Sequence, residues 1–203
     1  MSADDVIGFY ERHAKTWAGD RSRMRLLFEK AWLDRFAAPI PAGATILDLG
    51  CGFGKPMAAY LIGRGFDICG VDSSSSMIGM AKANFPEREW IVADMRTLDL
   101  GRRFAGIMAW DSFFHLNHED QQRMFPVFAA HAAANAPLLF TSGPRHGEAI
   151  GQLFGEPLYH ASLAPDEYRA LLAAHGFAVV DARMEDPDCD RHSVWLARRN
   201  EDR

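Results

Sequence analysis

Apolar residues along the chain fall into two alternating patterns, short continuous runs and longer segments with helical spacing. Short apolar runs bounded by Gly, Pro or Asp indicate buried strands, and apolar positions three to four residues apart indicate amphipathic helices. The expected strands are 45–49, 66–71, 89–93, 106–110 and 137–141, and the expected helices between them are 56–62, 76–84 and 119–134. This alternation predicts βαβ units and a parallel sheet that is buried on both faces.

The segment before the first strand is expected to be helical. Ser2 and Asp5 have the spacing of a capping box, and Tyr10 and Trp17 lie on one face of the helix that follows. A second helix is expected from about residue 22 until prolines end it after residue 38. We therefore expect residues 1–40 to form a helical cap on a domain of residues 41–203.

The last third of the chain has a different pattern. Residues 143–157 are rich in Gly and Pro and are expected to form a loop or insertion, followed by a short strand at 158–163. A helix is expected at 165–175, because proline opens it and glycine follows it. The strands expected at 177–182 and 193–197 are compatible with a hairpin. In the middle of the chain, Pro126 is expected to kink or split the helix that contains it.

A glycine-rich loop follows the first strand, with Gly50, Gly52 and Gly54 at alternate positions and Pro56 opening the next helix. Glycine lets the backbone turn sharply and approach a ligand without a Cβ clash. Amides at the start of a helix face a polar or anionic ligand group. A tight strand–helix turn without a ligand is the alternative interpretation.

Acidic residues lie at the ends of three consecutive expected strands. Asp48 lies in the first strand, Asp72 ends the second and Asp94 ends the third. The carboxyl edge of an open α/β sheet is where ligands bind, and an acid in the position of Asp72 can accept hydrogen bonds from both ribose hydroxyls. Asp72 and Asp94 are each also compatible with a helix N-cap, but the set of three indicates a nucleoside site.

The loop differs from that of dinucleotide-binding proteins. A G-x-G-x-x-G loop requires glycine at position 55, where this chain has Lys55. Asp48 also lies where it would repel a pyrophosphate. A nucleoside that has no phosphate and carries a positive charge fits better, although an NAD-dependent oxidoreductase remains as an alternative.

These motifs resemble those of the class I S-adenosylmethionine (SAM)-dependent methyltransferases. The resemblance rests on residues 47–54, 71–72, 93–95 and 109–112, and it extends in order over about residues 40–200. It implies a Rossmann-like three-layer αβα sandwich with a seven-stranded, mostly parallel sheet and a C-terminal antiparallel hairpin strand. Many relatives have a Gly-Gly turn before the fifth strand, where this chain has Asn135-Ala136-Pro137.

The resemblance also implies a cofactor site. The backbone at Gly50 and Gly52 is expected to hold the methionine moiety, Asp72 the ribose hydroxyls and Asp94 the adenine amino group. Met77 is expected to contact the adenosine, and Trp110 the methionine or sulfonium region. The expected cofactor-binding residues are Tyr10, Trp17, Arg25, Asp48, Gly50, Cys51, Gly52, Asp72, Ser73, Met77, Asp94, Met95 and Trp110.

Two of these assignments have open alternatives. Tyr10 and Trp17 are equally compatible with packing of the cap onto the domain. Arg21 or Arg25 is expected to pair with the cofactor carboxylate, the alternative being a solvated surface charge.

The acceptor side is expected to lie after the fourth strand. Asp111, Ser112 and His115 are interspersed there with aromatic residues, and Tyr159 and His160 are expected to form the far wall. His115 and His160 are candidate general bases, because the pKa of histidine lies near neutrality. For each of them, packing or capping is the alternative interpretation.

Composition narrows the functional classes. The chain has 203 residues, which suits one domain, and a formal net charge of −5 with no run of Lys or Arg, so we expect no nucleic-acid partner. It has three cysteines, and no CxxC motif or convincing metal site occurs in the sequence. The acidic start and the absence of a long apolar run predict a cytoplasmic protein without a membrane partner.

The sequence therefore predicts an enzyme that transfers a methyl group from SAM to an O or N atom of a small-molecule acceptor. In-line displacement at a sulfonium needs alignment and exclusion of water more than a catalytic side chain. The alternatives are a non-catalytic SAM-binding module and a protein methyltransferase. The sequence gives no oligomeric state.

Overall fold

The alternation of strands and helices is confirmed in a computed structural model, which describes residues 1–23 and 28–201. The α-helices are α1 (Ala3–Arg23), α2 (Lys30–Ala37), α3 (Met57–Gly63), α4 (Ser75–Asn84), α5 (His118–His131) and α6 (Pro165–Ala174). The strands are β1 (Thr45–Leu49), β2 (Asp67–Asp72), β3 (Glu89–Val92), β4 (Gly106–Ala109), β5 (Pro137–Ser142), β6 (Gly147–Leu153), β7 (Glu156–Ser162), β8 (Phe177–Asp186) and β9 (His192–Arg199). Short 3₁₀ turns are η1 (Met95–Thr97), η2 (Phe113–His115) and η3 (Pro187–Cys189).

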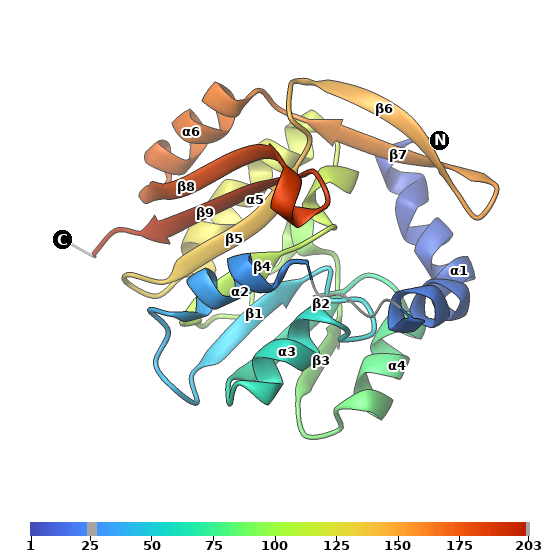
Figure 1. Ribbon diagram of the computed structural model, residues 1–203, viewed down its shortest axis with the longest axis horizontal. Helices are drawn as coiled ribbons and strands as arrows, with labels where there is room; N and C mark the ends of the chain where they lie inside the picture. Colours follow the sequence, from blue (N-terminus) through green and yellow to red (C-terminus); the bar gives the residue numbers. More distant parts are fainter. Residues whose placement is uncertain (24–27, 202–203) are drawn as a thin grey trace.

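Seven of these strands form the central sheet, in the order β3-β2-β1-β4-β5-β9-β8 (Figure 1). The pairings among β1 to β5 are parallel, whereas β9 runs antiparallel to both β5 and β8. The expected mostly parallel sheet with a C-terminal antiparallel hairpin is therefore confirmed. Strand order reverses between β1 and β4, and such a switch point forms the ligand crevice of open α/β sheets.

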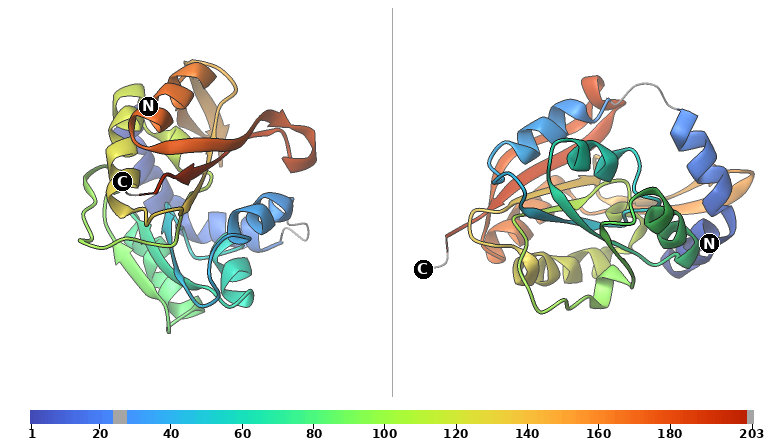
Figure 2. Two further views of the ribbon diagram at one scale, coloured as in Figure 1. Left: turned by 90° about the vertical axis from the view of Figure 1, so that its left-hand side faces the viewer. Right: turned by 90° about the horizontal axis from the view of Figure 1, so that it is seen from below.

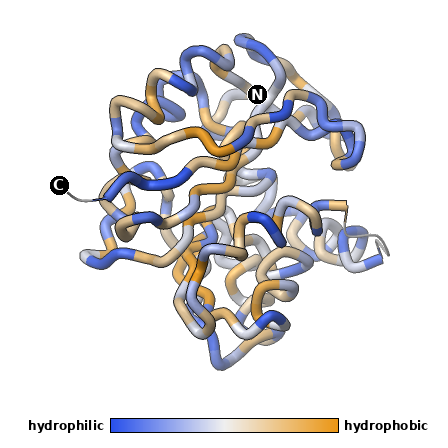
Figure 3. Tube along the Cα trace, turned by 60° about the vertical axis from the view of Figure 1, so that its left-hand side comes forward, coloured by the Kyte–Doolittle hydropathy of each residue, from blue (hydrophilic) through white to orange (hydrophobic). Residues whose placement is uncertain are grey.

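Helices cover both faces of the sheet, which gives three layers (Figure 2). Successive residues of a strand point to opposite faces, so Ile46 packs with α2, α3 and α4 while its neighbour Leu47 packs with α5 and α6. Because both faces are covered, the central strands are hydrophobic along almost their whole length (Figure 3). The polar side chains that can contact a ligand therefore lie at the carboxyl ends of these strands.

Three expectations were wrong. Of the two alternatives for residues 143–157, a loop or an insertion, the loop is wrong, because β6 lies within them and pairs with β7 as a separate two-stranded sheet. Most of β6 is exposed, so it lacks the apolar alternation that predicts a strand. The second helix does not begin near residue 22, where α1 still continues to Arg23, but at Lys30. Finally, α5 is not split at Pro126; it continues through this residue and ends at His131, before the expected position 134.

Candidate active site

The glycine-rich loop after β1 brings backbone amides to the edge of the sheet. Gly50 has φ +72°, and a Cβ atom there would lie 2.2 Å from the Cβ of Ser112. The Gly50 amide donates to the carbonyl of Val71 at 2.8 Å, which joins the loop to the end of β2. Only glycine meets both the conformational and the steric requirement at this position.

Two carboxyl groups lie beside this loop, Asp48 buried and Asp72 half-buried. Asp72 accepts hydrogen bonds from the amide of Gly52 at 2.9 Å and from the amide of Ser74 at 2.8 Å. Asp48 is 4% exposed, and burial, followed by the nearby charge of Asp72, raises its pKa to about 7. Burial also raises the pKa of Asp72, despite its two amide donors. A positively charged ligand would relieve this unfavourable pairing of acids.

Asp94, the third acid at the strand ends, forms an ion pair with Arg96. Asp94 caps η1 through the amide of Arg96 and also holds the guanidinium group of Arg96 at 2.6–3.0 Å. Arg96 additionally binds Asp4 of α1 at 2.8 Å and Asp120 of α5 at 3.0 Å. Asp4 and Asp120 are distant from Arg96 along the chain, so no local sequence pattern predicts this network.

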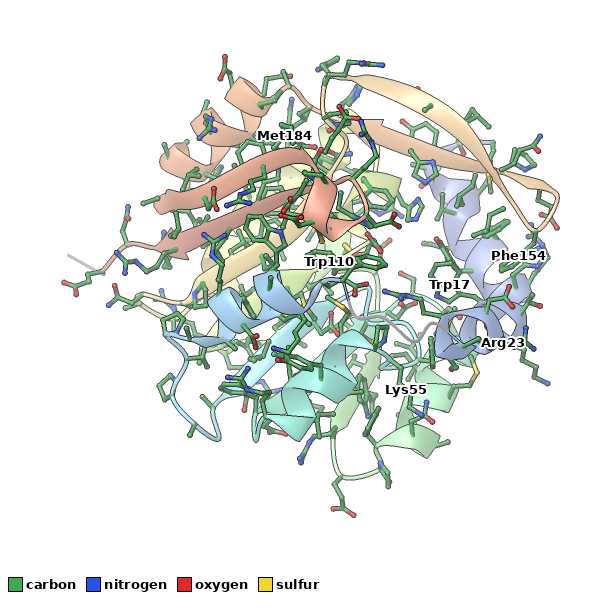
Figure 4. The ribbon with its side chains drawn as sticks, in the orientation of Figure 1. Trp17, Arg23, Lys55, Trp110, Phe154 and Met184 are labelled. Atoms are coloured by element: carbon green, nitrogen blue, oxygen red, sulfur yellow. The ribbon has the colours of Figure 1, made fainter. Side chains whose placement is uncertain are left out.

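One cavity joins these groups. It is lined by every expected cofactor residue that the structure describes; Arg25 lies outside the described residues. Helix α1 closes one side of the cavity; Figure 4 shows Trp17 on this helix and Trp110 at the central sheet, and both line the cavity. The cavity volume is about 150 Å³.

Polar contacts hold α1 in place. Tyr10 hydrogen-bonds His115 at 3.0 Å and packs edge-on against Trp17. Glu11 accepts hydrogen bonds from the Ser74 and Ser76 hydroxyls, each at 2.6 Å, at the start of α4. Arg21, the alternative carboxylate-binding residue, lines the cavity and pairs with Glu29.

A second cavity of about 430 Å³ lies between the β6–β7 hairpin and the start of β9. Two pairs of contacting side chains lie between the two cavities, and in each pair one residue lines each cavity. Asp111 lines the first cavity and His192 the second, and His192 Nε2 lies 3.0 Å from Asp111 Oδ1. Likewise His115 lines the first and His160 the second, with their ring centres 4.9 Å apart.

The hydrogen bonds of His115 and His192 determine their protonation. His115 Nδ1 donates to the carbonyl of Tyr159 at 2.9 Å, so Nε2 accepts from the Tyr10 hydroxyl. Burial lowers the pKa of His115 to about 4, and the ring is neutral. In His192 both nitrogens face acceptors, the carboxylate of Asp111 and the carbonyl of Cys189. This ring is therefore a cation, and Asp111 raises its pKa to about 9 against the opposing effect of burial.

The expected acceptor residues do not all reach the cavities. Asp111, Ser112 and His115 line the first cavity and His160 the second, but Tyr159 lines neither. The Tyr159 ring packs against α1, and its carbonyl orients His115. The Ser112 hydroxyl donates a hydrogen bond to the carbonyl of Leu49 at 2.8 Å.

Sequence reasoning assigned no role to His192. Its ring stacks on Trp110 with the ring centres 5.6 Å apart. Within the described residues, no group of three or more His, Cys, Asp or Glu side chains can hold a metal ion. No described helix has the length and apolar character needed to span a membrane.

Comparison with known proteins identifies the segment that carries the site. Residues 46–134 match a methyltransferase domain. Over 60 residues the chain is 42% identical to a trans-aconitate 2-methyltransferase from Azoarcus sp.; the match covers 29% of this chain and 23% of that protein. The chain therefore spans about a quarter of the length of this curated relative.

Two solved structures share the fold. The SAM-bound amino pentose methyltransferase of calicheamicin biosynthesis from Micromonospora echinaspora has a TM-score of 0.71 and 18% identity, over 91% of this chain and 96% of that chain. A SAM-dependent methyltransferase from Clostridium acetobutylicum has a TM-score of 0.73 and 13% identity, over 94% of this chain and 99% of that chain. Residues 46–134 thus match a methyltransferase domain, and the chain shares the Rossmann-like fold of these solved methyltransferases.

Proposed function

We propose that the protein transfers the methyl group of SAM to an O or N atom of a small molecule and releases S-adenosylhomocysteine (SAH). The observation that carries this proposal is the pair of acids, buried Asp48 and half-buried Asp72, beside the glycine-rich loop in one cavity. This site suits a cationic nucleoside without a phosphate. The solved relative from Micromonospora echinaspora contains SAM, which supports the same cofactor here.

The proposed roles within the cofactor cavity follow its geometry. Asp72 receives the ribose hydroxyls, and the loop at Gly50 and Gly52 receives the methionine moiety. The adenine ring lies toward Met77 and Asp94, with Asp94 sharing its carboxylate between the adenine amino group and Arg96. The remaining proposed cofactor contacts are Tyr10, Trp17, Cys51, Ser73, Met95 and Trp110, all of which line the cavity.

Methyl transfer at this site needs alignment more than activation. The lone pair of the acceptor attacks the methyl carbon, and the bond from carbon to sulfur breaks with its electrons moving to sulfur. The protein has to hold the two atoms about 3–3.5 Å apart and exclude water. The cap formed by α1 and the buried ring of Trp110 support that role. His115 and His160 are the proposed general bases for an acceptor that has to lose a proton.

The proposed acceptor is a small molecule, and we propose neither a nucleic-acid nor a membrane partner. Residues 1–40 serve as the cap of the catalytic domain, because α1 closes the cofactor cavity. A cytoplasmic location is supported by the three cysteines, all of which are free and buried.

The test combines binding with turnover. Isothermal titration calorimetry measures SAM and SAH binding, and mass spectrometry measures SAH formation in the presence of a panel of small hydroxyl and amine compounds. The proposal predicts binding of both nucleosides and SAH formation that depends on an acceptor. Tight SAM binding with no turnover on any acceptor would instead support the non-catalytic module, and no binding of either nucleoside would contradict the proposal.

A further inference from the structure

Asp111 has an uncommon backbone conformation just after the end of β4. Its φ is +48°, in the left-handed region that a residue with a side chain seldom adopts. The Asp111 amide donates a hydrogen bond to the Thr141 hydroxyl on β5 at 2.9 Å, which helps to hold this conformation. Backbone strain of this kind persists where surrounding contacts fix it, and it clusters at functional sites. The conformation therefore marks Asp111 as a candidate for a functional role.

The two oxygens of the Asp111 carboxylate differ in what they contact. Oδ1 lies 3.0 Å from Nε2 of His192, which is a cation because both of its nitrogens face acceptors. The Thr141 hydroxyl also lies near Oδ1, whereas Oδ2 has no hydrogen-bond partner within residues 1–23 and 28–201. The Asp111 side chain is 28% exposed and lines the cofactor cavity. It therefore presents an unused, negatively charged hydrogen-bond acceptor that a ligand can reach.

The polar side chains nearest to Asp111 in this cavity are already engaged within the protein. The Ser112 hydroxyl donates to the carbonyl of Leu49, and the Tyr10 hydroxyl donates to His115. The other nitrogen of His115 is bound to the Tyr159 carbonyl. A hydrogen bond to a neutral hydroxyl oxygen is also weaker than one to a carboxylate. Oδ2 is therefore the preferred acceptor for an O–H or N–H group of a ligand in this part of the cavity.

Asp111 lies close to the expected position of the sulfonium, if SAM binds as proposed above. The sulfur joins the ribose, assigned to Asp72, to the methionine chain, assigned to the loop at Gly50. Ser112, the neighbour of Asp111, packs so closely on this loop that a Cβ atom at Gly50 would lie 2.2 Å from its own Cβ. Burial raises the pKa of Tyr10, and the charges of Asp111 and Asp72 raise it further, so both carboxylates lie near this hydroxyl. Asp111 is thus close to both ends of the segment that contains the sulfur.

We infer that Oδ2 of Asp111 faces the methyl group of bound SAM and accepts a hydrogen bond from the nucleophilic O–H or N–H group of the methyl acceptor. This inference rests on the proposed function. The hydrogen bond turns a lone pair of the nucleophile toward the methyl carbon, which supplies the alignment that in-line transfer needs. Asp111 orients the nucleophile, a role distinct from the uptake of its proton. It favours a hydroxyl or an amine over a carboxylate nucleophile, which has no hydrogen to donate and carries the same charge as Asp111.

Sinefungin tests this placement, because it carries a carbon with an ammonium group where SAM has its methyl-bearing sulfur. SAH has a neutral sulfur without a methyl group at the same point. The two ligands therefore differ only where the methyl group is transferred, and calorimetric titration of the whole chain measures the affinity of each. We expect the wild type to bind sinefungin at least about tenfold more tightly than SAH, as is typical for a hydrogen bond between charged groups.

Asp111→Asn removes the charge with little change of shape, and asparagine also adopts the left-handed backbone conformation. We expect this variant to lose at least about tenfold in sinefungin affinity and to bind SAH within about twofold of the wild type. The SAH affinity also reports whether the variant is folded. Asp190→Asn is the matched control, because Asp190 has a φ of +47° but does not line the cofactor cavity. Its affinities for both ligands should equal those of the wild type.

Different failures have different meanings. A wild type that binds sinefungin no more tightly than SAH overturns the inference, and this comparison needs no variant to fold. An unchanged sinefungin affinity in Asp111→Asn also overturns it. So does an equal loss of affinity for both ligands, because Asp111 would then bind a part that the two share, such as the ammonium group of the methionine chain. Failure of the wild type to bind either ligand would overturn the proposed function itself.

Discussion

The amide of Gly52 donates a hydrogen bond to Asp72 Oδ2 at 2.9 Å, and this contact joins the loop after β1 to the end of β2. The other carboxylate oxygen of Asp72 accepts from the amide of Ser74, the N-cap of α4. One acid therefore fixes the glycine-rich loop relative to the next helix. The same carboxylate lines the cofactor cavity, so loop geometry and ligand binding depend on one side chain.

Asp72→Asn tests this dependence. Loss of the charged acceptor is expected to weaken SAH binding by about 2 kcal/mol, or roughly thirtyfold, as is typical for hydrogen bonds to a charged group. Calorimetric titration with SAH measures the change. Asp99→Asn is the control, because Asp99 is exposed and lines neither cavity. Equal affinities for the two variants would remove Asp72 from the site.

Gly50→Ala tests the steric requirement of the loop. Gly50 and Gly101 both have positive φ, but a Cβ atom at Gly101 meets nothing within 4 Å. The alanine variant of Gly101 should lose only the conformational cost of about 1–2 kcal/mol. Gly50→Ala should lose more stability and also cofactor binding, because its Cβ would overlap Ser112. Urea unfolding of both variants measures the difference, and equal losses would refute the steric argument.

SAM affinity should depend on pH through Asp48. The pKa of this buried acid is raised to about 7, so the folded protein keeps a proton that the unfolded chain has already released. The associated stabilisation is present below the unfolded pKa and is lost as pH rises through about 7. A cationic ligand prefers the carboxylate, so SAM should bind more tightly as pH rises to about 7 and then reach a plateau. Titrations in buffers of different ionisation enthalpy should detect proton release below this pH, and Asp48→Asn should abolish it.

Nuclear magnetic resonance of the histidine side chains should distinguish His192 from His115. His192 should remain a cation until about pH 9 and His115 should remain neutral down to about pH 4. The raised pKa of His192 stabilises the fold below 6.5, and this contribution is lost as pH rises through about 9. Asp111→Asn should lower the pKa of His192 toward or below its ordinary value. A neutral His192 at pH 7 in the wild type would contradict the assigned ion pair.

Local sequence patterns predicted the parts of the fold that burial dictates. The strand leading to Gly50 and the acids that end the next two strands were identified because each lies within a short, continuous segment. Strand β6 was missed because it is mostly exposed and lacks an apolar face. Pro126 did not split α5, although local propensity alone favours a break there.

Contacts between distant segments were the part of the site that sequence could not supply. His192 lies 81 positions after Asp111 in the sequence. The two side chains meet only because β9 pairs with β5. The hydrogen bond from His115 Nδ1 to the Tyr159 carbonyl likewise requires β7 to lie against η2. No local pattern in a single sequence encodes such pairs. An alignment of relatives could reveal them.

The most direct test of the central claim is a crystal structure of the protein with SAH. The account predicts that both ribose hydroxyls lie within hydrogen-bonding distance of the Asp72 carboxylate, with the adenine ring toward Met77 and Asp94. Density for SAH at any other place, with the edge formed by Asp48 and Asp72 empty, would contradict the account.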